Sequence, residues 1–316
     1  MESQGKTTLN PMYPQVKVLP LESLGALRMR GRDVVAFLQG QLSSDVTRLG
    51  VARWLLAGYH NPQGRVLALM RLFEPAPGEV LALLPRELVT PVMTRLRAFI
   101  LRSKVELADD SAAWRIEGLI GAEAPPPAAQ LPGAAAAVAR LGESFVVRVG
   151  AHPARWLSVS PAAAHDAGAF AQCERAQPEL WQRHAIANGE PQVYAATSGE
   201  FLAQMLNLDA LGAIAFDKGC YTGQEVIARA HYRGRVKRRL QRFRTAERRQ
   251  LQPGDTGELR DRRTFRVVDA VPLADGCEFL AVAPLPGEAR AVEAPAPAST
   301  APLEATQLPL PYELPE

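Results

Sequence analysis

The residues with the clearest chemical potential lie between positions 218 and 240, where the sequence is KGCYTGQEVIARAHYRGRVKRRL. Thr222 precedes Glu225 by three residues, just before an apolar pair, and this capping-box pattern predicts a helix over residues 223–232. Cys220 then lies just before the helix N-terminus and close to Lys218. Helix-terminal amides and a nearby cation both stabilise a thiolate, so the pattern predicts a reactive thiol at Cys220.

A structural role for the same cysteine stays open. Cys220 lies between Gly219 and Gly223, an arrangement that is also typical of a cysteine packed in a tight turn. The rest of the sequence offers no competing catalytic pattern: the five histidines have no catalytic spacing, and HExxH, GxGxxG and P-loop motifs are absent. The three cysteines are far apart and form no CxxC pair, so we expect neither a disulfide framework nor a stably bound metal.

The net charge of +3 conceals an uneven distribution, because residues 1–228 are neutral, residues 229–249 carry +9 and residues 250–316 carry −6. The ten cationic side chains of the middle part, called the basic segment below, are Arg229, Arg233, Arg235, Lys237, Arg238, Arg239, Arg242, Arg244, Arg248 and Arg249. As a strand, this segment has cations on both faces, which is unusual for a core strand. One interpretation is a solvated edge strand that its charge protects against aggregation. The alternative is an anion site for polyglutamate, phosphate or an RNA backbone.

The elements that must position these residues are predicted to form α+β layers. Hydrophobic patterns predict strands at residues 24–30, 53–60, 65–74 and 79–84, with a turn at 61–64. A helix is predicted up to Leu101, with Thr90 as N-cap and Pro91 as its first residue, because proline is tolerated near a helix start. After Gly234, short extended runs alternate with Pro/Gly turns, which predicts a small all-β domain.

The compartment is predicted to be the reduced cytoplasm. The first 15 residues contain neither an apolar signal-peptide core nor an Arg-rich amphipathic pattern. No apolar run approaches the roughly 20 residues that span a bilayer, so we expect no membrane partner. The composition, 47% hydrophobic and 22% charged, is that of a globular protein and excludes a mainly disordered chain.

The sequence around Cys220 also resembles a known family. The octapeptide KGCYTGQE at residues 218–225, followed by Arg229 and a Tyr-Arg-Gly tripeptide, is similar to the signature of the YgfZ family. The members of this family are folate-binding relatives of the glycine-cleavage aminomethyltransferase. The segments at residues 37–45, 61–73 and 186–191 follow the family order, and the resemblance covers roughly residues 20–245.

The resemblance implies a GcvT-like fold, a ring of three small domains around a channel. Two are α/β (ferredoxin-like) lobes and the last is a small C-terminal β-barrel. The corresponding division is a first lobe at 15–118, an Ala/Pro-rich linker at 119–142, a second lobe at 143–235 and the barrel with an acidic tail at 236–316. It implies tetrahydrofolate or a derivative as ligand, and a role in assembly or repair of iron–sulfur enzymes, including tRNA-modifying ones.

The resemblance also implies roles for single residues. Cys220 is the key thiol, as nucleophile, redox group or transient cluster ligand, and Lys218 is expected to lower its pKa. The expected ligand-binding residues are Trp181, Tyr221, Gln224 and Arg229, and those that shape the motif are Gly219, Thr222, Gly223 and Glu225. Trp181 matches a family tryptophan associated with folate binding, and an indole offers a flat face to an aromatic ligand. A second family tryptophan is replaced here by Leu24.

Two other functions stay open. The aminomethyltransferase itself has a catalytic aspartate seven residues after the asparagine that corresponds to Asn61, but this chain has Ala68 there. Methylene transfer is therefore disfavoured, and the sequence favours an accessory protein over an enzyme. The other alternative is a tRNA- or RNA-binding module that uses the basic segment, with phosphate contacts that weaken as salt rises.

Overall fold

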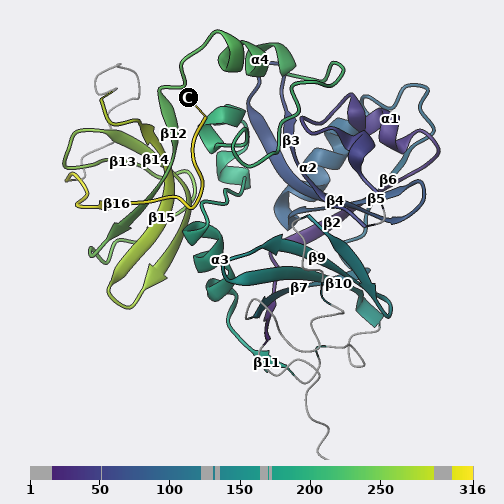
Figure 1. The fold of residues 1–316 in the computed structure, drawn as a ribbon, viewed down its shortest axis with the longest axis horizontal. Helices are drawn as coiled ribbons and strands as arrows, with labels where there is room; N and C mark the ends of the chain where they lie inside the picture. The colour runs from purple at the N-terminus through teal and green to yellow at the C-terminus, as the bar shows by residue number, and fades with distance from the viewer. Residues whose placement is uncertain are drawn as a thin grey trace, which may run out of the picture.

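The computed structural model describes residues 16–50, 52–121, 131, 136–163, 170, 173–287 and 301–315. Within these residues, three β-sheets and a few helices form the molecule (Figure 1). The sheets are mixed or antiparallel and the helices are short, so the predicted α+β class is confirmed, with more residues in strands than in helices. The predicted linker at 119–142 lies mainly outside the described residues.

The first sheet has the strand order β3-β4-β5-β2-β6. Its strands are β2 (Leu24–Arg30), β3 (Leu55–His60), β4 (Val66–Ala76), β5 (Glu79–Pro85) and β6 (Glu106–Asp109). Along β2, Leu27 and Met29 join the core beneath α1 (Val34–Gln39) and α2 (Arg86–Arg97), whereas Ala26 joins a core shared with the second sheet. Alternate residues of a strand point to opposite faces, so this sheet is covered on both sides.

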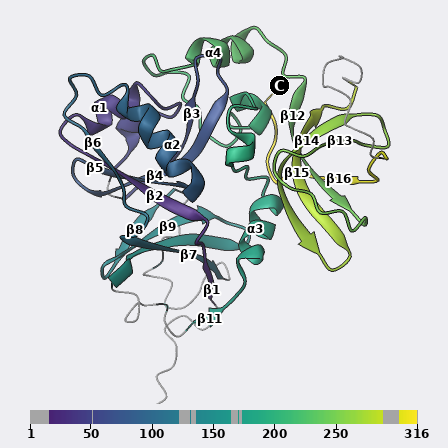
Figure 2. The same ribbon diagram turned by 180° about the vertical axis from the view of Figure 1, so that it is seen from behind.

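The second sheet has the order β11-β1-β7-β10-β9-β8. Its strands are β1 (Lys17–Pro20), β7 (Trp114–Gly121), β8 (Val138–Leu141), β9 (Ser144–Gly150), β10 (Ala154–Pro161) and β11 (Glu174–Arg175). The helix α3 (Pro178–Ala187) follows β11 and lies between this sheet and the C-terminal sheet, as both views show (Figures 1 and 2).

The C-terminal sheet has the order β13-β14-β15-β12-β16. Its strands are β12 (Arg238–Thr245), β13 (Thr256–Glu258), β14 (Thr264–Leu273), β15 (Gly276–Pro284) and β16 (Thr306–Leu308). The described strands form no closed barrel, because β13 and β16 remain unpaired edges; one bridge between Leu259 and Leu303 lies near the gap. The closed β-barrel expected from the sequence is therefore not observed.

Two predicted N-caps are wrong. The helix α2 begins at Arg86 after Pro85, so Pro91 lies inside the helix and Thr90 is not its N-cap. Burial of the apolar face stabilises the helix by more than the loss of one backbone hydrogen bond at the internal proline destabilises it. That face consists of Leu88, Val89, Val92, Met93 and Leu96.

The second wrong N-cap belongs to α4 (Gln224–Tyr232), whose extent agrees with the predicted helix to within one residue. Its N-cap is Gly223 in a left-handed conformation, and no side chain caps the helix. Thr222 and Glu225 therefore form no capping box, and Glu225 instead contributes an acidic side chain to the first turn.

Among the described helices, none is long and apolar enough to cross a bilayer. None of the three cysteines, all within the described residues, forms a disulfide; Cys173 and Cys277 are buried and Cys220 is exposed. Within the described residues, no cluster of His, Cys, Asp and Glu side chains has the geometry of a metal site.

Candidate functional site

Lys218 joins the loop that carries Cys220 to the chain between α1 and β3. Its ammonium donates to the carbonyl oxygens of Gln39, Leu42 and Ser44 at 2.8, 2.7 and 2.8 Å. A lysine ammonium has three donors, so these acceptors use all of them. Burial lowers the pKa of Lys218 to about 8, against the raising effect of Asp45. The structure thus places the Lys218 charge in a structural contact between two loops.

Gly223 brings the same loop against the turn between β3 and β4. Its φ is +84°, and a Cβ built there would lie 2.6 Å from the carbonyl oxygen of Asn61 and 3.0 Å from Cα of Gly64. Only glycine permits both this backbone conformation and this approach. The octapeptide, the turn at Asn61 and the segment after α1 therefore meet in one place, although they are far apart in the sequence.

Cys220 lies exposed on this loop, ahead of α4. Tyr221 next to it is buried, and its ring centroid lies 5.0 Å from the Lys218 ammonium. Gln224 Nε2 is 3.5 Å from the Lys218 carbonyl oxygen, a long hydrogen bond. Arg229 is exposed in the last turn of α4. The thiol is therefore open to a partner molecule, while its neighbours fix the loop.

A separate cavity of about 400 Å³ lies where the three sheets meet. Its walls come from Leu24 and Arg71 of the first sheet, Leu157 of the second, Asp269 of the third, and Trp181 and Gln182 of α3. The size lies within the usual range for small-molecule sites. Trp181 lines this cavity, whereas Tyr221, Gln224, Arg229 and Cys220 are not among its lining residues. The predicted site residues thus fall into two places.

Trp181 gives the cavity an aromatic wall. A Cβ built on Gly118 of β7 would lie 2.5 Å from the Trp181 ring, so the absence of a side chain at Gly118 lets the ring pack against the strand. The guanidinium of Arg155 lies 5.4 Å from the ring centroid. Leu24, at the position of the second family tryptophan, lines the same cavity with an aliphatic side chain.

Asp269 supplies a buried carboxylate to the cavity. It accepts hydrogen bonds from Gln182 Nε2 at 2.6 Å, from Tyr194 Oη at 3.0 Å and from the backbone N–H of Ala270 at 2.9 Å. Burial raises the pKa of Asp269 to about 6, and these donors only partly oppose that shift. A carboxyl group in this range changes protonation near neutral pH.

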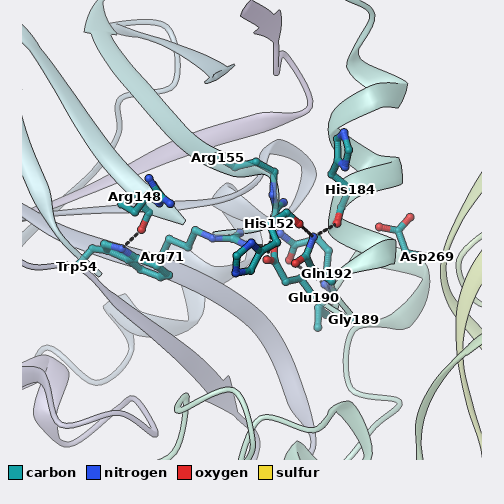
Figure 3. Close-up of polar contacts among 12 residues, drawn as sticks. Trp54, Arg71, Arg148, His152, Arg155, His184, Gly189, Glu190, Gln192 and Asp269 are labelled. Carbon is teal, nitrogen blue, oxygen red and sulfur yellow. Dashed lines mark hydrogen bonds and ion pairs between the residues drawn. The ribbon is translucent and has the colours of Figure 1, made fainter. Parts of the chain in front are cut away.

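A second charged group reaches the same cavity through Arg71 of β4 and Glu190 after α3, with Arg155 of β10 as its third member (Figure 3). Arg155 donates to Glu190 Oε1, and Arg71 Nη2 lies 3.6 Å from Glu190 Oε2. Neither these three residues nor Asp269 were predicted from the sequence as site residues. They come from separate elements and form no local motif, and the one available signal was a charged residue within an apolar strand.

The basic segment is largely tied into the fold. β12 lies between β15 and β16, so the predicted solvated edge strand is wrong. Arg239 is 5% exposed and pairs with both carboxylate oxygens of Asp209, at 3.0 and 2.9 Å. The other ion pairs of this strand are Arg242 with Glu278 and Arg244 with Asp275. The cations that stay exposed are Arg229, Arg233, Arg235, Lys237, Arg244 and Arg248.

The sequence is similar to those of bacterial proteins named tRNA-modifying protein YgfZ. The chain is 33% identical over 277 residues to the tRNA-modifying protein YgfZ of Serratia proteamaculans, covering 84% of this chain and 83% of that protein. It is 34% identical over 274 residues to the Escherichia coli protein of the same name, covering 82% of each. The corresponding Vibrio vulnificus protein is 33% identical over 233 residues, covering 73% of this chain and 70% of the relative. No protein-family model matches the sequence.

The fold is similar to that of a solved aminomethyltransferase. The glycine cleavage system aminomethyltransferase T from Bartonella henselae superposes with a TM-score of 0.65 over 86% of this chain and 79% of that structure. The sequence identity is only 12%, so this comparison establishes the fold alone.

Proposed function

This chain belongs to the YgfZ family, and we propose that it is a tetrahydrofolate-binding accessory protein for the assembly or repair of iron–sulfur enzymes. Its clients include enzymes that modify tRNA, and its compartment is the cytoplasm, which suits three cysteines that form no disulfide. The observation that carries the proposal is the cavity of about 400 Å³ with Trp181 in its wall.

Tetrahydrofolate fits the residues of this cavity. It combines a flat pterin and a benzoyl ring with polar edges and a carboxylate end. Trp181 offers an aromatic face, worth about 0.5–1.5 kcal/mol beyond area burial. Asp269 and Tyr194 offer polar groups beside it. In this proposal, the three sheets that line the cavity form the ring of domains around the ligand channel.

Cys220 is the proposed working thiol. Its exposure suits a reaction or contact with a second protein, and Lys218, Tyr221 and Gly223 hold its loop. A nucleophile, a redox group and a transient cluster ligand remain the three forms of this proposal. Lys218 then acts mainly as a positioning residue, because all three N–H groups of its ammonium already donate hydrogen bonds to carbonyl oxygens.

Aminomethyl transfer remains disfavoured. Ala68 is fully buried in β4 and brings no carboxylate to the position where the transferase has its catalytic aspartate. The RNA-binding alternative keeps support only from the exposed cations at residues 229–237 and 248, because acids pair with Arg239, Arg242 and Arg244.

Ligand binding is tested by titrating tetrahydrofolate against the purified protein and following tryptophan fluorescence. We expect saturable binding that Trp181→Phe weakens by about threefold to tenfold. The matched control is Trp114→Phe in β7, which is half-buried outside the cavity and should leave the affinity unchanged. Absence of binding to the wild type would overturn the folate proposal.

The thiol is tested in a strain that lacks its own protein of this family. Cys220→Ala should fail to restore the activity of an iron–sulfur enzyme that thiolates tRNA, while the buried Cys173→Ala restores it. Both variants should show the same melting temperature as the wild type within a few degrees. Full restoration by folded Cys220→Ala contradicts a role for the thiol.

A further inference from the structure

The charged cluster of Arg71, Arg155 and Glu190 contains more unpaired hydrogen-bond donors than unpaired acceptors. Two arginines, Arg71 and Arg155, share one carboxylate, Glu190, so this cluster has a net positive charge (Figure 3). Among the described residues, Arg71 Nε and the Nε and Nη1 atoms of Arg155 have no hydrogen-bond partner, against one such acceptor, Glu190 Oε2. A buried donor without an acceptor is costly, and more so when it is charged.

Arg71 is the arginine of the cluster that faces the cavity, which Glu190 also lines. Arg71 lines it with a side chain that is 15% exposed, whereas Arg155 is fully buried behind Trp181 and pairs with Glu190. The separation of 3.6 Å between Arg71 Nη2 and Glu190 Oε2 exceeds a normal hydrogen bond. Arg71 therefore has an ion-pair neighbour but retains donors for another acceptor.

The other acids of the cavity do not meet this need. Asp269 already accepts hydrogen bonds from Gln182, Tyr194 and its neighbouring backbone N–H. Glu179 lies at the exposed rim. Burial lowers the pKa of Arg71, Glu190 raises it and Arg155 lowers it again, so the second arginine offsets part of the help that Glu190 gives.

We propose that Arg71 is an anion subsite of this cavity and receives a carboxylate of the ligand, with Glu190 and Arg155 as positioning residues. A planar guanidinium offers paired donors that match the two oxygens of a carboxylate. The inference rests on the proposed function, because in a tetrahydrofolate the carboxylates belong to the glutamate end. That end, rather than the pterin, is then the part of the ligand next to Arg71.

The test compares tetrahydrofolate with its diamide, in which both glutamate carboxylates are blocked as primary amides. By calorimetry, the wild type should bind tetrahydrofolate about tenfold to a hundredfold more tightly than the diamide. Arg71→Gln should bind the two ligands equally, at the affinity of the wild type for the diamide. Arg71→Lys, which keeps the charge without the paired donors, should fall between them.

The control is Arg30→Gln, which removes the same charge from the same sheet at an exposed ion pair with Glu106 and should keep the wild-type preference. If Arg71→Gln does not fold, the ratio of the wild-type affinities for tetrahydrofolate and the diamide still tests whether the cavity binds a ligand carboxylate. The anion subsite alone is overturned if the wild type binds both ligands with equal affinity. It is also overturned if Arg71→Gln loses the same affinity for both ligands. A wild type that binds no tetrahydrofolate overturns the proposed function as well.

Discussion

Asp269 illustrates how burial and hydrogen bonding compete at a single carboxylate. Three donors favour its ionised form, yet removal from water has the larger effect and raises its pKa to about 6. The folded protein therefore binds a proton at this site over a range of pH in which the unfolded chain has released it. The consequence is a dependence of stability on pH whose sign differs from that of a salt-bridged aspartate.

We expect Asp269 to destabilise the fold progressively as the pH rises from about 4 to about 6, and fully above that range. Asp269→Asn cannot ionise, so the free energy of unfolding of the variant, relative to the wild type, should rise by up to about 3 kcal/mol across this interval. Urea denaturation at several pH values measures the difference. The control is Asp275→Asn, whose carboxylate is 68% exposed, and parallel profiles for the wild type and Asp269→Asn would contradict the expectation.

The sequence could mark Asp269 as an acid inside an apolar strand, but not its role. Its partners Gln182 and Tyr194 lie 87 and 75 residues away, on α3 and in the loop that follows. The burial of Arg239 was equally hard to predict, because its position in a run of basic residues suggested solvent exposure. Asp209, which neutralises it inside the protein, lies 30 residues upstream. Local pattern reveals residue type and spacing, whereas burial of a charge depends on a distant partner.

At the scale of elements, strands were easier to predict than helix starts. β2 spans Leu24–Arg30 as predicted, because an alternating apolar run has one favourable arrangement in a sheet. The start of α2 was missed because tertiary burial tolerates Pro91 within the helix. The N-cap of α4 was missed because Gly223, packed against the turn at Asn61, replaces Thr222 as N-cap.

Gly223→Ala should destabilise the protein by about 2 kcal/mol or more, since a left-handed alanine costs 1–2 kcal/mol before its Cβ meets the Asn61 carbonyl. Gly219→Ala in the same loop is the matched control. A Cβ there meets nothing within 4 Å, so we expect a change within about 0.5 kcal/mol. Urea denaturation measures both variants, and equal stabilities would show that the loop does not need this close approach.

At the scale of the whole molecule, the C-terminal residues connect parts that the sequence analysis treated as separate. Tyr312 donates to the carbonyl oxygen of Gly189 at 2.8 Å and accepts from Asn207 Nδ2 at 3.3 Å. Asn207 in turn donates to the carbonyl oxygen of Leu240 in β12. The end of the chain therefore fastens the segment after α3 to the C-terminal sheet. An acidic, proline-rich composition gave no sign of this contact.

Tyr312→Phe should lower the free energy of unfolding by about 1 kcal/mol, because it removes a partly buried hydroxyl that serves two partners. Tyr232→Phe is the control, since that side chain is 68% exposed and its change should be near zero. Differential scanning calorimetry measures the two melting temperatures. A Tyr312→Phe variant as stable as Tyr232→Phe would mean that the C-terminal contact adds nothing to stability.

The cavity takes residues from Leu21 to Asp269, so its walls are distributed along almost the whole chain. During synthesis, the first sheet can form while the ribosome is still adding the strand that carries Asp269. The wall on that side is missing until this strand has left the exit tunnel and paired with β15. A ligand held by all three sheets can therefore stabilise the fold fully only once β14 is in place, and a chain truncated before β14 would gain less from it.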